Sequence, residues 1–375
     1  MTHTLLTLNC GSTSTKLAWF VDDEAVARRS LDVPLADLAG MPKVLDQLDY
    51  RTAQVRDFLA EHRLDVAELD MVVARAGTIW QVPTDGAYEV NELMLATLRH
   101  APPAQHASAL SALIGVQLVT GLDVPVIIYD PTCVDAVDPV AKVTGLPEVT
   151  NLPVMHLLNT KAAGHTYAAS VGRRYQDLNL VIAHLGGGIS LGFHDHGRVA
   201  DWVYDDEGPL SPQRAGRIPT RFLTDLCYDG TRTHQQMRMY LAGGSGLAAW
   251  FGTQDVRDVE AMIDAGDAQA ELVYRAMALG VAKAIGELSV VRGGRVDQIV
   301  LTGGIAHSQL LVGWVRELVE FIAPVTVLPG EQELEALAAG GRRVLDGEEV
   351  VHPYDVLPPG YSSLAEIYAR PSFLA

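Results

Sequence analysis

Residues 5–20 read LLTLNCGSTSTKLAWF, an apolar run, a small polar turn and a second apolar run. This pattern predicts two strands joined by a turn, because short apolar runs bounded by Gly and Ser are typical of strands. Residues 180–200 read LVIAHLGGGISLGFHDHGRVA and repeat the order of strand, glycine-rich turn and strand. The similarity predicts two halves that begin alike, although two unrelated hairpins would give the same pattern.

Strand-like runs alternate with helical stretches along the rest of the chain. The apolar runs at 71–73, 126–129 and 299–301 predict strands. Apolar residues at helical spacing predict helices at 55–61, 92–99, 108–119, 159–171, 268–291 and 332–345. This alternation favours an α/β protein with mixed sheets.

A third glycine turn, LTGGIAHS at residues 301–308, follows the last of these strands. Glycines let backbone N–H groups approach a ligand closely, and the N-terminus of a following helix favours an anion. Most turns of this kind merely redirect the chain, so this turn carries weight only together with the other two.

The composition of the 375 residues is that of an ordinary soluble globular protein, with 48% hydrophobic and 20% charged residues. The 46 acidic and 28 basic residues give a formal charge of −18, which argues against nucleic acids and membranes as partners. Three cysteines without CxxC spacing make disulfides and zinc sites unexpected and favour a reducing cytoplasm. No apolar stretch approaches ~20 uninterrupted residues, so we expect neither a membrane span nor a signal peptide.

The three turns share their order and spacing with a known superfamily. NCGSTSTK at 9–16, HLGGGIS at 184–190 and LTGGI at 301–305 resemble motifs of acetate and sugar kinases, heat-shock chaperone ATPases and actin. Within that superfamily the chain is most similar to the butyrate kinases, through RAG at 75–77, YEVNE at 88–92, EGPLSPQRAG at 207–216, FIAPV at 321–325 and PGEQELEALA at 329–338.

This resemblance implies a two-lobed, actin-like α/β ATPase fold made of duplicated ribonuclease H-like domains around a central cleft. We expect an N-terminal lobe at 1–150, with the first phosphate loop and the contacts to the acyl substrate. A C-terminal lobe at 151–335 would hold the second phosphate loop, the adenosine site and a dimer interface. Residues 336–375 would form a C-terminal helix and tail that return to the N-terminal lobe.

The resemblance also implies an ATP-dependent phosphotransferase with a carboxyl group as acceptor, which uses ATP/ADP and Mg²⁺. The expected reaction is reversible phosphoryl transfer from ATP to butyrate, or to a branched short-chain fatty acid, giving acyl phosphate and ADP. Acetate or propionate specificity stays open, as does an actin-like ATPase or nucleotide switch that forms no acyl phosphate. The resemblance further implies a cytoplasmic homodimer or larger homo-oligomer.

The resemblance assigns the nucleotide and phosphate contacts to the three turns. The expected contacts are Asn9, Ser12, Ser14 and Lys16 in the first phosphate loop, His184, Gly186, Gly187 and Gly188 in the second, and Gly303 and Gly304 in the adenosine turn. Hydroxyl, ammonium and backbone N–H groups suit phosphate oxygens. The alternative at the first turn is a capped Ser/Thr turn with a solvated lysine.

Four further residues are candidate catalytic groups, namely Arg75, Asp130, His156 and Arg214. Phosphoryl transfer requires charge neutralisation and alignment more than covalent help, which suits guanidinium and imidazole donors. Arg75 stands in RAG, where the butyrate branch usually has RGG, and is expected to clamp a carboxylate or phosphate. His156 is also compatible with a hydrogen-bonded core histidine, and Asp130 with a turn cap before proline.

The metal would be held by Asn9, Asp130 and Glu333, with Glu331 as the alternative to Glu333. Mg²⁺ prefers oxygen ligands and keeps several waters, so amide and carboxylate oxygens fit it. Acidic residues near a helix N-terminus are also favoured by the helix dipole alone. A general base is unnecessary, because a fatty-acid carboxylate has no proton to lose near neutral pH.

Overall fold

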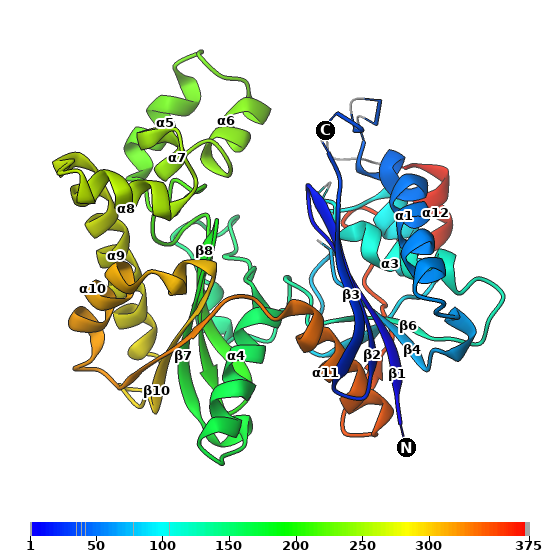
Figure 1. Cartoon of the computed structure of the whole chain (residues 1–375). Coiled ribbons are helices and arrows are strands. Elements are labelled where there is room, and N and C mark those ends of the chain that lie inside the picture. Colours follow the sequence, from blue (N-terminus) through cyan, green and yellow to red (C-terminus); the bar gives the residue numbers. More distant parts are fainter. Residues whose placement is uncertain are drawn as a thin grey trace. The chain divides into compact units, whose positions relative to one another are not determined.

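The computed structural model describes residues 2–371 except 35, 39, 42, 78 and 105. The chain divides into two compact units (Figure 1). The first contains Met1–Ala136 and Gln332–Ala375, and the second contains Val137–Glu331. Each unit consists of a mixed β-sheet with α-helices packed against it.

The first unit is built on a sheet with the strand order β12-β5-β6-β4-β1-β2-β3. Its strands are β1 (Thr4–Cys10), β2 (Ser14–Val21), β3 (Glu24–Asp32), β4 (Met71–Arg75), β5 (Ala87–Glu89), β6 (Val126–Tyr129) and β12 (Val351–His352). β1, β2 and β3 form an antiparallel meander, whereas β1, β4 and β6 run parallel. All residues of β4 and β6 are buried, as expected for parallel strands covered on both faces.

The helices of the first unit include two from the C-terminal part of the chain. They are α1 (Leu48–Glu61), α2 (Glu92–His100), α3 (Ala109–Leu118), α11 (Glu333–Leu345) and α12 (Leu364–Ala369), with 3₁₀ turns η1 (Val44–Gln47) and η2 (Val66–Glu68). α11 packs on β1 and β4. A Cβ atom on Gly341 would lie 2.5 Å from Cγ2 of Val73, so this approach requires glycine. The packing of α11 brings Glu333 into the same unit as the N-terminal strands.

The sheet of the second unit repeats the arrangement of the first, with the order β11-β10-β7-β8-β9. Its strands are β7 (Asn179–Leu185), β8 (Ile189–Asp195), β9 (Arg198–Val203), β10 (Gln298–Gly303) and β11 (Val325–Pro329). β7, β8 and β9 form an antiparallel meander, and β10 runs parallel to β7. The prediction of two halves that begin alike is therefore confirmed: β7-β8-β9 with β10 corresponds to β1-β2-β3 with β4.

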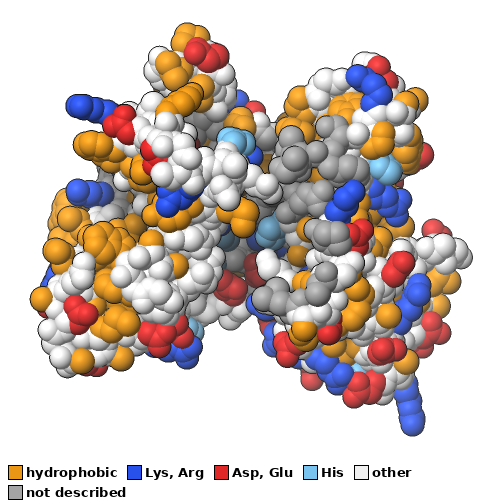
Figure 2. All heavy atoms as spheres, turned by 90° about the horizontal axis from the view of Figure 1, so that it is seen from above, with side chains coloured by type: hydrophobic (Ala, Val, Ile, Leu, Met, Phe, Trp, Pro, Cys, Tyr) orange, Lys and Arg blue, Asp and Glu red, His pale blue; other side chains and the backbone are white. Residues whose placement is uncertain are grey.

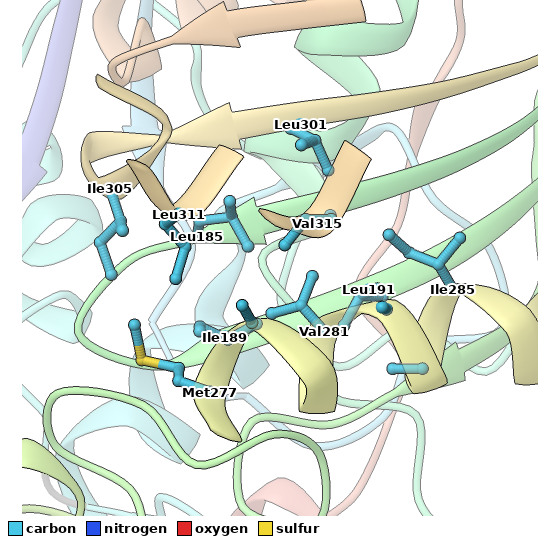
Figure 3. Packing of buried hydrophobic residues seen from close by; sticks show 14 of the residues in the cluster. Leu185, Ile189, Leu191, Met277, Val281, Ile285, Leu301, Ile305, Leu311 and Val315 are labelled. Atoms are coloured by element: carbon cyan, nitrogen blue, oxygen red, sulfur yellow. The ribbon is translucent and has the colours of Figure 1, made fainter. Parts of the chain in front are cut away.

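The helices of the second unit include α4 and α9, which pack on its sheet. In chain order, the helices are α4 (Leu157–Ser170), α5 (Thr220–Tyr228), α6 (His234–Leu241), α7 (Leu247–Phe251), α8 (Val256–Asp264), α9 (Ala268–Ser289) and α10 (Gln309–Val319), with 3₁₀ turns η3 (Pro139–Lys142), η4 (Tyr175–Asp177) and η5 (Gly304–His307). Figure 3 shows Met277, Val281 and Ile285 of α9 facing Ile189 and Leu191 of β8. This contact fixes the strand that follows the second glycine turn.

Charged side chains of both signs are mixed with apolar ones on the face seen in Figure 2. In the part of the chain that the structure describes, no helix combines the length and the apolar character needed to cross a membrane.

Two helical glycines of the second unit, Gly164 and Gly286, differ in their surroundings. A Cβ atom on Gly164 would lie 2.6 Å from the Tyr175 ring, whereas a Cβ atom on Gly286 would have nothing within 4 Å. We expect Gly164→Ala to lower the free energy of unfolding by about 1–3 kcal/mol through overpacking. Gly286→Ala should raise it by roughly 0.5–1 kcal/mol, because alanine loses less chain entropy on folding. Urea or thermal unfolding measures both, and equal effects would contradict the packing at Tyr175.

Candidate active site

Three of the predicted site residues lie at the carboxyl ends of neighbouring parallel strands in the first unit. Asn9 lies near the end of β1, Arg75 is the last residue of β4, and Asp130 directly follows β6. Arg75 pairs with Tyr129 across β4 and β6, so these strands end level with each other. The three side chains therefore share the edge of the sheet at which α/β folds bind ligands.

Arg75 is a nearly buried guanidinium with Glu333 beside it. Its side chain is 9% exposed, and its Nη2 lies 3.6 Å from Oε1 of Glu333. Among the residues that the structure describes, Nη1 of Arg75 has no hydrogen-bond partner. Asn9 donates from Nδ2 to the other oxygen of Glu333. Asn9, Arg75 and Glu333 thus form one cluster, in which Arg75 keeps donor capacity for an anion.

Asp130 is buried and has a positive φ of 43°. This conformation costs a non-glycine residue of order 1–3 kcal/mol and persists only where the surroundings enforce it. Here Asp130 exchanges two hydrogen bonds with Gly86. Its N–H donates to the Gly86 oxygen at 3.0 Å, and the Gly86 N–H donates to its Oδ1 at 2.9 Å. The second bond is the turn-capping contact that the alternative interpretation of Asp130 expects.

The turn between β1 and β2 holds the remaining residues of the predicted first phosphate loop. Ser12 is exposed, and Ser14 is half-buried where it begins β2. Lys16 is exposed and pairs with Asn9 across the two strands. Paired residues point to the same face of a sheet, so Lys16 and Asn9 face one side together. The side chains of Ser12 and Lys16 are accessible to a ligand.

In the second unit, the rings of His156 and His184 stack with their centroids 4.3 Å apart. His156 is the N-cap residue of α4, and its Nδ1 lies 2.8 Å from Oγ of Ser190. His184 is buried near the end of β7, with its Nε2 at 3.5 Å from Oε1 of Glu331. The stack places two imidazoles beside the glycine turn that follows β7.

The glycine turn between β7 and β8 is held by a neighbouring loop. The Ser211 hydroxyl donates to the oxygen of Gly187 at 2.6 Å, and the N–H of Gln213 donates to the same oxygen at 3.0 Å. A Cβ atom on Gly188 would lie 2.2 Å from Oδ2 of Asp205. A side chain at Gly188 would therefore displace this carboxylate.

Arg214 forms ion pairs with two aspartates. Its Nε lies 3.2 Å from Oδ2 of Asp205 and 3.0 Å from Oδ1 of Asp206, and its Nη1 donates to the oxygen of Ala242 at 2.8 Å. Burial raises the pKa of Asp205 to about 6, although the nearby Arg214 guanidinium opposes the rise. Asp205, which the sequence analysis did not single out, connects the glycine turn to Arg214.

Gly303 and Gly304 lie at the end of β10 beside a pocket of about 830 Å³. Gly303 has a φ of 93°, and a Cβ atom there would lie 2.4 Å from the oxygen of Leu185, so this position requires glycine. The pocket volume falls within the roughly 300–1,000 Å³ usual for small-molecule sites. The pocket is lined by Gly186, Gly187, Gly304, Pro212, Gln213, Gln254, Asp255, Val256, Arg257, Glu260, Ile305, His307, Ser308 and Glu331.

Part of the pocket comes from α8 and the residues before it, where the sequence analysis predicted no helix and no ligand contact. Asp255 is the N-cap of α8 and accepts a hydrogen bond from the N–H of Arg257 at 2.9 Å. Glu260 accepts one from the Tyr274 hydroxyl at 2.8 Å and another from the Ser308 hydroxyl. These residues carry no motif of their own, and only the fold brings α8 close to the end of β10.

The chain is similar to known proteins in sequence and in fold. Residues 159–340 match the model of the acetokinase family. One similar solved structure is the acetate kinase of Porphyromonas gingivalis, with 18% identity and a TM-score of 0.73, covering 92% of this chain and 100% of that one. Another is a propionate kinase of Francisella tularensis, with 17% identity and a TM-score of 0.70, covering 90% of this chain and 98% of that one. The acetate kinase of Entamoeba histolytica also matches, with 16% identity and a TM-score of 0.71, covering 90% of this chain and 99% of that one.

The strand order and these similarities confirm the expected α/β fold of two actin-like units. They do not separate butyrate kinases from the acetate and propionate kinases. The match to the acetokinase family covers residues 159–340, and the protein is an ATP-dependent phosphotransferase with a carboxyl group as acceptor.

Proposed function

We propose that this protein is a short-chain fatty-acid kinase that transfers the terminal phosphate of Mg-ATP reversibly to butyrate or to a branched short-chain acid. The observation that carries the proposal is Arg75, whose Nη1 is buried and unpartnered in the described part of the chain. A buried guanidinium requires anionic or other acceptors for its N–H groups. Glu333 lies 3.6 Å from Nη2 of Arg75 and does not serve Nη1. A substrate carboxylate or a phosphoryl group would supply the missing acceptors.

The pocket of the second unit supports ATP as the phosphate donor. Gly186 and Gly187 of one glycine turn and Gly304 of another line the pocket. Backbone N–H groups at such turns bind polyphosphate, and the remaining volume suits a nucleoside. The proposed adenosine contacts at Gly303 and Gly304 are therefore contacts with backbone.

The proposed metal ligands fit a hydrated Mg²⁺. Asn9 uses its amide nitrogen to bind Glu333, which leaves its amide oxygen for a metal or its water. Across the described residues, no three His, Cys, Asp or Glu groups are close enough to hold an ion by themselves. Mg²⁺ usually keeps several waters and shares its ligands with phosphates, so Asn9, Asp130 and Glu333 would suffice. When bound, the ion would neutralise phosphate charge.

The side chains would then neutralise and align the reactants. The acceptor carboxylate is already ionised near neutral pH, so no residue has to remove a proton from it. Arg75 would orient the acceptor, and Arg214, His156 and His184 would donate to the oxygens of the moving phosphoryl group. Because Arg214 is held by Asp205 and Asp206, its position is set before the substrate binds.

Specificity for four- or five-carbon acids rests on the motifs shared with butyrate kinases. The similar solved structures are named acetate and propionate kinases, which supports those acids as the alternative.

The acid preference is tested with wild-type protein, Mg-ATP and hydroxylamine, which traps an acyl phosphate as its hydroxamate. We expect the hydroxamate yield to peak at butyrate, isobutyrate or isovalerate, since each methylene is worth about 1–3 kcal/mol in an apolar pocket. A peak at acetate or propionate would support the alternative acids. Release of ADP without any hydroxamate would favour an ATPase or nucleotide switch.

The role of Arg75 is tested by Arg75→Ala, measured as kcat/KM for hydroxamate formation. Removing one preorganised donor typically costs about 2.7–4 kcal/mol of barrier, so we expect a hundred- to thousand-fold loss. Arg28→Ala is the control, because Arg28 is exposed and pairs with Glu335 at 2.8 Å in the same unit. If Arg75→Ala were as active as Arg28→Ala, the proposed clamp would be wrong.

Asp205 gives a prediction on pH and stability. Its pKa in the folded protein, about 6, lies above the ordinary value of 3.8. The group therefore favours the folded state below the ordinary pKa, and this contribution is lost as the pH rises through about 6. Relative to wild type, Asp205→Asn should become more stable between pH 4 and 7, by up to about 3 kcal/mol.

Thermal unfolding of wild type and Asp205→Asn at pH 4.5, 5.5 and 7 measures this difference. Asp206→Asn is the control, since Asp206 also pairs with Arg214 but is 41% exposed and so pays less for desolvation. A difference that stays constant with pH for Asp205→Asn would contradict the raised pKa.

A further inference from the structure

Arg51 is a fully buried arginine of α1 that contacts the turn between β1 and β2. It lies outside the motifs and the candidate catalytic residues. Its Nη1 donates to the backbone oxygens of Gly11 and Ser14 at 2.9 and 3.0 Å and to Oγ1 of Thr15 at 3.1 Å. Its Nη2 donates to the backbone oxygen of Ser12 at 3.2 Å. One guanidinium thus binds most of the proposed first phosphate loop from behind.

The charge of Arg51 is not balanced by a carboxylate in the described part of the chain. Its other partners are the neutral amide oxygen of Gln47, at 3.1 Å from Nε and 2.9 Å from Nη2, and the buried thiol of Cys10. Burial lowers the pKa of Arg51 from its ordinary value, but arginine stays protonated at neutral pH. Buried charges are usually paired with an opposite charge, because desolvation is costly. A full positive charge therefore lies directly behind the turn.

The contacts of Arg51 also set the direction of the peptide groups in the turn. In a planar trans peptide, the C=O of one residue and the N–H of the next point in opposite directions. The oxygens of Gly11 and Ser12 point toward Arg51. The N–H groups of Ser12 and Thr13 must therefore point away from it. Two backbone donors face outward at the turn, with a positive charge behind them.

We propose that Arg51 is a positioning residue of the first phosphate loop, which orients the loop's N–H groups toward the transferred phosphate and favours this anion through its unbalanced charge. The proposal rests on the function proposed above, and Arg51 itself does not touch the substrate. An arginine that only stabilised the fold would make the same hydrogen bonds, with or without a carboxylate beside it. An arginine that attracts an anion loses this effect when a carboxylate balances its charge.

Gln47→Glu separates these two roles. The substitution keeps the oxygen that accepts from Arg51 and adds a carboxylate at the same place, so the fold and the loop are retained while the charge is balanced. Ala53→Glu is the matched control, because it adds the same charge to an exposed position of α1. Arg51→Ala is less informative, since it leaves several buried acceptors unpaired and destabilises the fold.

The reverse reaction, from butyryl phosphate and Mg-ADP, gives separate kinetic constants for the two substrates. For Gln47→Glu we expect kcat/KM for butyryl phosphate to fall about 5- to 50-fold, because the added carboxylate cancels the attraction between Arg51 and the phosphate. Such an attraction acts at short range in a partly buried site. The KM for Mg-ADP should stay within about twofold of wild type, and the midpoint of thermal unfolding should not fall. Calorimetric titration with inorganic phosphate, which needs no turnover, should show weaker binding.

Unchanged constants for butyryl phosphate and unchanged phosphate binding would overturn the role of Arg51. Equal losses for both substrates, accompanied by a lower unfolding midpoint, would overturn it as well and leave Arg51 as a structural residue. If wild-type protein transfers no phosphate to ADP, the proposed function fails; the phosphate titration then decides separately whether Arg51 favours an anion at the turn.

Discussion

The parallel pairing of β1 with β4 and of β7 with β10 is the constraint on which the candidate site depends. Parallel neighbours end at the same edge of a sheet, so residues far apart in sequence become adjacent there. In the first unit this edge gathers Asn9 and Arg75, and in the second it gathers His184 and Gly303. The antiparallel partner of each first strand, β2 or β8, adds a turn at that same edge. The same arrangement thus gives each unit a polar turn beside a strand end.

Close packing at glycine then completes each edge. α11 reaches the first sheet because Gly340 and Gly341 have no side chains, and its first residue, Glu333, thereby meets Asn9 and Arg75. In the second unit, Gly188 makes room for the carboxylate of Asp205, and Gly303 makes room for the backbone of Leu185. Glycine serves here for close approach as well as for turning the chain. An isolated helix or strand would accept alanine at these positions. Here the neighbouring atoms leave no room for a Cβ atom.

Apolar periodicity reports burial directly, so the sequence predicted β1, β2, β4, β6, β7, β8 and β10 and the long core helices. It did not predict β3, β5, β9, β11 or β12. Each predicted strand lies within an observed strand, and the predicted helices are observed with shifted ends. The short helices α5 to α8 escaped prediction, since α5 has no buried residue and α6 and α8 have one each. The motifs located the candidate site, but not Asp205, Glu260 or Arg51. Their importance lies in burial and in partners distant along the chain, which no local pattern reveals.

Anion binding by a chain with a net charge of −18 requires that positive charge be concentrated where it is needed. Buried guanidinium groups meet this requirement better than surface lysines, because solvent and salt screen them less. The three arginines of the candidate site differ in how far their charge is balanced. Arg214 is paired with two aspartates, Arg75 lies 3.6 Å from one glutamate, and Arg51 contacts neutral groups. Of these three arginines, the two in the first unit therefore keep the larger unbalanced charge, which suits the proposed binding of the acceptor carboxylate by Arg75 and of the transferred phosphate by the first phosphate loop.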